Sequence, residues 1–185
     1  PIVRMFVAHS GEDSEMSIEE LGLSPNLVDL LKNKWGIKEL YPPQKKALPA
    51  ALSGKNIMLT IPTASGKSLV AHLTIAHRLK NDLEMQKALY VVPLKALATE
   101  KYNELKEVAE VVGLKVGIAI GDRNSHNNSI DDSDILVCTS EKLDSLLRNR
   151  SEIISKIGIV VSDEFHLLHD PGRGPTLEVL ITRIR

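Results

Sequence analysis

The sequence predicts an α/β fold in which a parallel β-sheet is covered by helices on both faces. Short, continuous apolar runs such as "ALYVV" (88–92) and "ILVC" (135–138) recur between longer segments with helical spacing. Strands that are buried on both faces have such unbroken apolar runs, whereas a sheet with one face in water would alternate apolar and polar residues. The alternation of strand and helix along the chain favours parallel pairing.

Composition and charge narrow the class of protein. A chain of 185 residues suits one domain with a sizeable core. The formal net charge of -1 argues against a protein that wraps nucleic acid with a strongly basic surface. The single cysteine, Cys138, excludes an internal disulfide and fits a reducing compartment. No apolar run approaches the ~20 residues of a membrane span, so we expect an intracellular, cytoplasmic protein.

Residues 1–23 are interpreted as an N-terminal extension of a domain that covers residues 24–185. A short apolar run in this extension is followed by the acidic "GEDSEMSIEE", so a strand and a partly ordered segment both stay open. A helix is predicted next, with Ser24 as its cap, Pro25 as its first residue and Gly36 at its end. A second helix, in 41–54, is expected to be broken or kinked near Pro49.

The rest of the domain is predicted as strand–helix pairs. Strands are assigned to continuous apolar runs, and helices to segments whose apolar residues recur at helical spacing. In chain order these are a strand at 56–61, a helix at 68–81, a strand at 87–93, a helix at 94–113, a strand at 115–121, a polar loop at 122–133, a strand at 134–139, a helix at 140–150 and a strand at 157–164.

The stretch "PTASGKS" (62–68) is interpreted as a loop that holds nucleotide phosphates. It differs from the pattern G-x-x-x-x-G-K-[ST] because Ile61, the last buried residue of the strand, replaces the first glycine. Backbone N–H groups of the loop and of the following helix converge on an anion in this context. Lys67 is expected to reach the β- and γ-phosphates and Ser68 to ligate Mg²⁺. The predicted cradle also includes Pro62, Thr63, Ala64, Ser65 and Gly66.

A second sign of a nucleotide site is the pair of carboxylates in "VVSDEFH" (160–166). Asp163 and Glu164 follow a buried strand, and parallel sheets bind ligands at the carboxyl ends of their strands. Asp163 is expected to hold Mg²⁺ mainly through water, and Glu164 to orient or deprotonate the attacking water. An acidic helix cap would explain the pair if it stood alone. With the phosphate loop also present, we expect the two motifs to meet in one crevice.

At these residues the chain resembles the first RecA-like domain of a superfamily-two helicase of the DExH-box kind. "PTASGKS" resembles motif I and "DEFH" resembles motif II, while "YPPQ" resembles the adenine-reading Q motif. "VVPLKALATEKYNEL" is similar to motif Ia, and "GD" and "TSEKLDSLLR" to later nucleic-acid motifs. "DEFHLLHDPGRGPTLE" is similar to the Ski-type group and, within it, to archaeal DNA helicases that act at stalled forks.

The resemblance implies an ATP- and Mg²⁺-dependent helicase or translocase that acts on single-stranded or forked DNA. It implies that Gln44 reads adenine and that His166 couples the nucleotide site to the nucleic acid. Tyr41 is either a neighbour of the adenine or a hydrophobic anchor. A Ski-type RNA helicase and a nucleotide-dependent binding module without unwinding are the alternatives. The implied nucleic-acid contacts are Pro93, Leu94, Lys95, Gly121, Asp122, Thr139, Ser140 and Lys142.

The 185 residues contain no motif that resembles motifs III to VI. In the family these motifs belong to the end of the first RecA-like domain and to a second one, which supplies an arginine finger. The resemblance therefore implies a second RecA-like domain of the same protein as a partner. We expect this chain to be a monomer that binds ATP but hydrolyses it poorly, because an arginine finger contributes about 10³–10⁵-fold to turnover in related systems.

Overall fold

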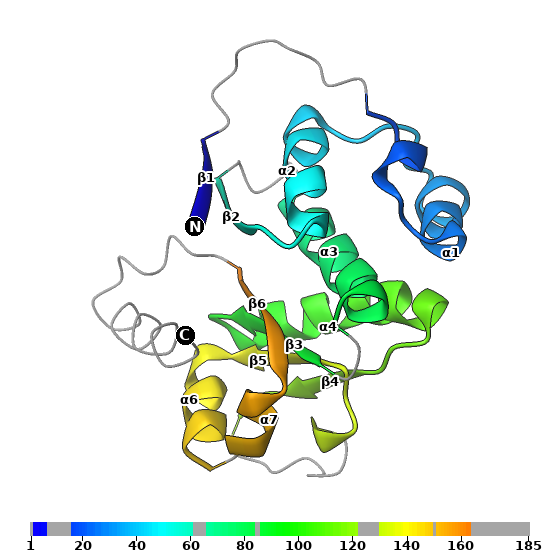
Figure 1. Cartoon of the computed structure of the whole chain (residues 1–185). Coiled ribbons are helices and arrows are strands. Elements are labelled where there is room, and N and C mark those ends of the chain that lie inside the picture. Colours follow the sequence, from blue (N-terminus) through cyan, green and yellow to red (C-terminus); the bar gives the residue numbers. More distant parts are fainter. Residues whose placement is uncertain are drawn as a thin grey trace. The chain divides into compact units, whose positions relative to one another are not determined.

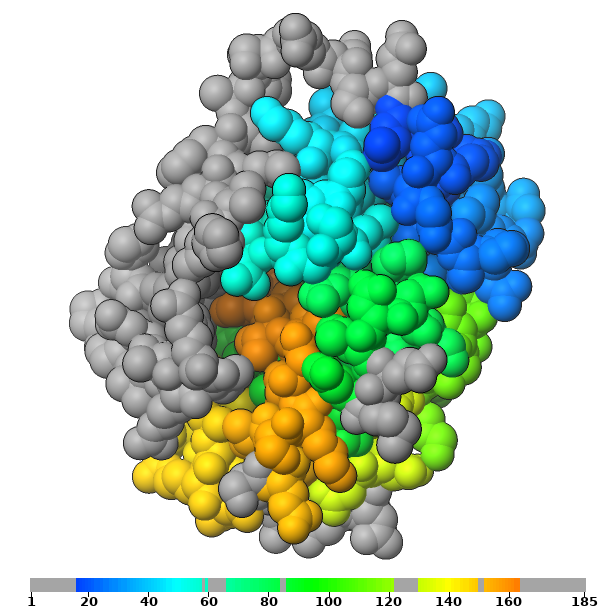
Figure 2. Space-filling view, in the orientation of Figure 1, coloured from blue at the N-terminus to red at the C-terminus, as the bar shows by residue number. Residues whose placement is uncertain are grey.

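The computed structural model describes residues 2–6, 16–60, 66–83, 86–121, 130–149 and 151–163, which are drawn in colour in Figure 1. Figure 2 is a space-filling view in the same orientation. The chain divides into two compact units, Pro1–Asp82 and Leu83–Arg185. Each unit contains parallel strands and helices, and each is described by itself below. None of the helices in the described part of the chain is long and apolar enough to cross a membrane.

The first unit contains a parallel pair of strands. β1 (Ile2–Phe6) pairs with β2 (Asn56–Thr60), so that Ile2 lies opposite Asn56. Of the two alternatives left open for the N-terminal residues, a strand is therefore the one found for 2–6. The helices of this unit are η1 (Glu19–Leu21), α1 (Pro25–Asp29), η2 (Leu30–Lys34), α2 (Pro42–Leu52) and α3 (Lys67–Asn81).

Local sequence signals set the two ends of the helical segment at 24–36 as predicted. The Ser24 hydroxyl accepts a hydrogen bond from the Leu27 N–H at 3.4 Å, and Pro25 opens α1. Gly36 has a φ of 66°, which ends the helical run. Of the break or kink predicted near Pro49, the break is wrong, because α2 continues to Leu52, and the kink stays a prediction. Pro49 lies within one turn of that end, and its carbonyl still accepts from the Ser53 N–H at 3.2 Å.

The second unit is a four-stranded parallel sheet in the order β4-β5-β3-β6. Its strands are β3 (Lys87–Val92), β4 (Val116–Ala119), β5 (Ile135–Thr139) and β6 (Ile157–Ser162). Every neighbouring pair in this sheet is parallel. Residues 88–92 of β3 and all of β5 are buried, as their unbroken apolar runs predicted.

Helices cover both faces of this sheet, which confirms the predicted α/β architecture (Figure 1). On one face, Leu89 and Leu136 join a core cluster with Leu143 of α6 (Ser140–Asn149) and Ile153 of α7 (Ser151–Ser155). Successive strand residues face opposite sides of a sheet. The other side chains of β3 therefore face α4 (Lys95–Val112), which contacts β3, β4 and β5. The short helix α7 had no counterpart in the sequence interpretation.

Cys138 belongs to the core, as expected. It is fully buried in the cluster beneath α6. Burial raises the pKa of its thiol to about 12, so the thiol stays protonated near neutral pH and acts as a small apolar side chain.

A one-residue bulge at Gly158 sets the face on which the end of β6 presents its side chains. Lys87 lies opposite Ile157, but Ala88 lies opposite Ile159, so Gly158 is an extra residue in β6. One extra residue moves every later side chain to the opposite face. Beyond the bulge Tyr90 lies opposite Val161. Asp163, two residues further on, therefore lies on the same face as Tyr90.

Candidate nucleotide site and nucleic-acid edge

The start of α3 has the features of a phosphate-binding helix N-terminus. Gly66 precedes the helix in the left-handed conformation, with a φ of 70°, and no side chain of the described residues caps this end. Lys67 and Ser68 occupy the first turn, where backbone N–H groups and the helix dipole attract an anion. The strand predicted before this stretch and the helix predicted after it are confirmed by β2 and α3. The predicted loop residues Pro62, Thr63, Ala64 and Ser65 lie outside the described residues.

Gln44 is hydrogen-bonded to the backbone that begins this helix. Its Nε2 donates to the carbonyl of Gly66 at 3.0 Å, and its Oε1 accepts from the Tyr41 N–H at 2.9 Å. A Cβ added to Gly66 would lie 2.2 Å from the Gln44 Nε2. Gly66 is thus required both by its positive φ and by the close approach of Gln44. The sequence predicted Gln44 as a site residue but not its contact with Gly66, since no local pattern links the two positions.

The amide of Gln44 retains capacity for a nucleotide base. A side-chain amide carries two N–H donors and two acceptor lone pairs, and the contacts with Gly66 and Tyr41 use one of each. The second donor and second lone pair match the N7 and N6 edge of adenine. Adenine recognition by Gln44 stays a prediction.

Tyr41 is an exposed aromatic side chain next to this helix start. Its side chain is 61% exposed, which contradicts the interpretation as a hydrophobic anchor. A ring carbon lies 3.8 Å from the position of a Cβ added to Gly66. An exposed ring beside a phosphate-binding turn is suited to stacking on a base.

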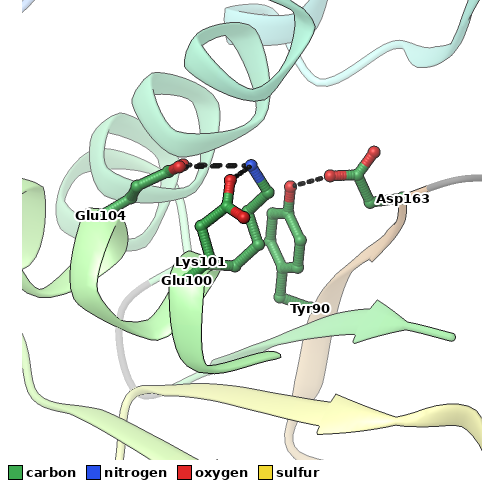
Figure 3. Close-up of polar contacts among 5 residues, drawn as sticks. All are labelled: Tyr90, Glu100, Lys101, Glu104 and Asp163. Carbon is green, nitrogen blue, oxygen red and sulfur yellow. Dashed lines mark hydrogen bonds and ion pairs between the residues drawn. The ribbon is translucent and has the colours of Figure 1, made fainter. Parts of the chain in front are cut away.

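In the second unit Asp163 follows β6 directly, as predicted, and is fixed at two points. The prediction that this strand is buried is wrong, since no residue of β6 is buried. The backbone N–H of Asp163 donates to the Val91 carbonyl at 3.0 Å. Its Oδ2 accepts a hydrogen bond from the Tyr90 hydroxyl at 2.7 Å (Figure 3). Tyr90 itself is fully buried. Glu164 and His166, the other predicted residues of this motif, lie outside the described residues, and the meeting of this motif with the phosphate loop stays a prediction.

The predicted nucleic-acid contacts gather at the carboxyl edge of the four-stranded sheet. Pro93, Leu94 and Lys95 follow β3, Gly121 follows β4, and Thr139 ends β5. The Lys95 side chain reaches Gly121, because a Cβ added to Gly121 would lie 3.2 Å from the Lys95 Nζ. Gly121 also has a φ of 71°. Asp122, predicted with this set, lies outside the described residues.

Members of this set differ in accessibility. Leu94 is 43% exposed and Lys95 is exposed, while Lys142 is partly exposed. Thr139 and Ser140 are each only 5% exposed. The Thr139 hydroxyl accepts from the Lys142 N–H at 3.4 Å, so it caps the start of α6. The side chains that a strand of nucleic acid could reach are therefore those of Pro93, Leu94, Lys95 and Lys142.

A group of charges on α4 was missed by the sequence analysis. Lys101 is 8% exposed, and its Nζ lies 3.3 Å from Glu104 and 3.4 Å from Glu100 (Figure 3). Burial raises the pKa of Glu104, and the Lys101 ammonium opposes that rise. The buried ammonium of Lys101 is therefore paired with carboxylates of its own helix. A buried charge needs such partners, so this group is explained by the stability of the fold.

Metal-ligating side chains do not cluster in the part of the chain that the structure describes. Within it, no group of three or more His, Cys, Asp or Glu side chains could hold a metal ion. The Asp163 carboxylate is an oxygen donor of the kind that Mg²⁺ prefers.

These features define a class of protein: a nucleotide-binding α/β domain with a RecA-like fold. Solved structures with this fold include the DUF1998 helicase MrfA, with a TM-score of 0.76 and 28% identity over 88% of this chain and 26% of that one. A hypothetical ATP-dependent RNA helicase from Sulfolobus tokodaii has a TM-score of 0.74 at 23% identity, over 86% of this chain and 47% of that one. At that identity the second likeness shows the fold alone.

The family follows from the sequence comparison. Residues 41–185 match the family model of the DEAD/DEAH box helicases, and the chain belongs to this family.

Curated relatives are longer than this chain. The ATP-dependent DNA helicase Hel308 of Methanocella arvoryzae is 48% identical over 175 residues, which cover 92% of this chain and 23% of that protein. The protein of the same name from Methanocaldococcus jannaschii is 42% identical over 165 residues, which cover 86% of this chain and 14% of that protein. The chain therefore spans less than a quarter of the length of these relatives.

Substituting Gln44 should separate its contact with Gly66 from recognition of adenine. We expect Gln44→Ala to weaken ADP binding by about tenfold and to abolish the preference for ADP over GDP, because guanine presents an acceptor where adenine presents a donor. Calorimetric titration of both nucleotides measures this, with Gln86→Ala, an exposed glutamine, as the matched control. Equal losses for ADP and GDP would show that Gln44 acts only through Gly66.

Proposed function

We propose that this chain is the ATP-binding part of an ATP-dependent DNA helicase or translocase. The observation that carries the proposal is the start of α3, where Gly66 adopts a positive φ against Gln44 and Lys67 and Ser68 fill the first turn. Membership of the helicase family supports ATP as the nucleotide. The names of the Hel308 relatives favour DNA over RNA as the nucleic acid, and hence an intracellular role.

Each residue of the proposed nucleotide site has a distinct task. Lys67 and the first N–H groups of α3 bind the β- and γ-phosphates, and Tyr41 and Gln44 bind the adenine. Asp163 and Ser68 would hold Mg²⁺, mainly through water. When bound, the ion neutralises charge that develops on the phosphates. Glu164 orients the attacking water and accepts its proton.

The carboxyl edge of the sheet is the proposed nucleic-acid surface. Lys95 and Lys142 supply cations there. Leu94, the residue before α4, provides no side-chain cap, so a phosphate can accept from the first N–H groups of that helix. Contacts of this kind position a strand without reading its bases. Binding is therefore expected to depend little on sequence.

Hydrolysis and unwinding are proposed to need a second RecA-like domain. Lys67, Ser68, Asp163 and Glu164 provide phosphate binding, metal support and water orientation. None of them places a cation opposite the γ-phosphate, where charge develops in the transition state. We propose that an arginine of a second RecA-like domain fills this role, and His166 is proposed to couple the nucleotide site to the nucleic acid.

Removing the Lys67 ammonium should weaken nucleotide binding and leave the fold intact. We expect Lys67→Ala to lower the affinity for ADP and for a non-hydrolysable ATP analogue by at least about tenfold, because a charge-assisted bond to phosphate is lost. Calorimetry measures the affinity, and circular dichroism checks the fold. Lys80→Ala, an exposed lysine on the same helix, is the control. If Lys67→Ala binds as tightly as the wild type, the phosphate assignment is wrong.

Binding of single-stranded DNA should be weak and salt-dependent. Each phosphate contact releases counterions, so Lys95→Ala should reduce the slope of log affinity against log salt by roughly 0.7. Fluorescence anisotropy with a labelled oligonucleotide at several salt concentrations tests this. Lys156→Ala is the matched control, because this exposed lysine precedes β6 and lies at the amino edge of the sheet. Tight binding that ignores salt, or equal losses for both variants, would contradict the proposed surface.

A further inference from the structure

We propose that Tyr90 is a positioning residue for the metal-binding carboxylate, holding Asp163 in the orientation that Mg²⁺-nucleotide binding requires. This inference rests on the proposed function, since it takes Asp163 as the carboxylate on the metal side. It assigns a role to a buried tyrosine that none of the sequence motifs singled out as a functional residue.

The contact is specific in its geometry. The Tyr90 hydroxyl donates to Asp163 Oδ2 at 2.7 Å, a distance typical of an O–H group bound to a charged oxygen. The backbone N–H of Asp163 is held separately by the Val91 carbonyl at 3.0 Å. Two adjacent residues of β3 thus fix the main chain and the side chain of Asp163.

Strand register explains why the two side chains can meet. Tyr90 lies directly opposite Val161, so Asp163 is the next residue of β6 on the same face. Without the extra residue Gly158, the carboxylate would lie on the opposite face of the sheet. Figure 3 shows the Tyr90 ring rising from β3 on the side of α4, with its hydroxyl directed at Asp163. The one-residue bulge therefore brings the Tyr90 hydroxyl and the Asp163 carboxylate to the same face.

The buried hydroxyl of Tyr90 also indicates a role beyond packing. The other residues from 88 to 92 are aliphatic, and the chain as a whole has only three tyrosines. Tyr90 is 0% exposed, and a buried hydroxyl costs free energy unless it is hydrogen-bonded. An aliphatic side chain would fill the same strand without that requirement. The hydroxyl is therefore best explained by its partner, Asp163.

A fixed carboxylate would matter for the metal. Donation to Oδ2 restricts rotation of the side chain, and Figure 3 shows the second oxygen directed away from Tyr90. The Tyr90 hydroxyl is neutral, so it orients the carboxylate without neutralising its charge. Groups that orient metal ligands in this way typically change metal affinity by about 10–100-fold when they are removed. The expected effect falls on the metal-dependent part of nucleotide binding.

The test compares nucleotide affinity with Mg²⁺ and with EDTA, by calorimetry with ADP on the 185-residue chain. We expect Mg²⁺ to tighten binding by the wild type, and Tyr90→Phe to reduce that gain by about tenfold while leaving the metal-free affinity unchanged. Tyr102→Phe, the same change at a partly exposed tyrosine of α4, should behave as the wild type. In Asp163→Asn the gain should vanish, and adding Tyr90→Phe should then have no further effect.

The outcomes distinguish the metal role of Asp163 from the positioning role of Tyr90. A wild type whose ADP affinity is the same with Mg²⁺ and with EDTA would overturn the proposed metal role of Asp163, and this inference with it. If Mg²⁺ tightens ADP binding by the wild type and by Tyr90→Phe to the same extent, this inference alone is overturned. Equal losses with and without Mg²⁺ in Tyr90→Phe would also overturn it, because a general packing defect acts on both conditions.

Discussion

Parallel pairing of β4, β5, β3 and β6 is the constraint on which the second unit depends. Because all four strands run in one direction, their carboxyl ends lie along one edge. Gly121, Thr139, Lys95 and Asp163, which are far apart in the sequence, therefore follow one another along that edge. Strand β3 is central in this arrangement, since it carries Tyr90 to the carboxylate of β6 and continues directly into the residues proposed to contact nucleic acid.

A comparable constraint acts in the first unit, where one glycine allows two elements to meet. The left-handed φ of Gly66 lets the chain enter α3, and its missing side chain leaves room for the Gln44 amide. The N-terminus of α2 is thereby joined to the N-terminus of α3 by a hydrogen bond. A change in either residue is expected to alter both the adenine contact and the phosphate contact.

Much of this could be predicted from sequence because the signals are local. Unbroken apolar runs located β3 and β5, Ser24 and Gly36 marked helix ends, and the order of strand, loop and helix located Lys67. Non-local features could not be predicted. The contacts of Gln44 with Gly66 and of Tyr90 with Asp163 depend on tertiary packing and on strand register. Gly158 did carry a signal, since a glycine within an apolar strand often marks a bulge. Pro49 misled because the buried residues Leu48, Ala51 and Leu52 keep α2 helical past it, at the cost of one helical hydrogen bond.

The most direct test of the account is a map of backbone amide NMR shifts as ligands are added. We expect Mg²⁺-ADP to shift the amide resonances of Gln44, Gly66, Lys67 and Asp163. Single-stranded DNA is expected to shift those of Lys95, Gly121 and Lys142. Amides at the amino ends of the strands, such as Val116, Ile135 and Ile157, should stay in place. Shifts concentrated at those amino ends, with the carboxyl edge unchanged, would contradict the claim that both ligands bind at the carboxyl edge and at the start of α3.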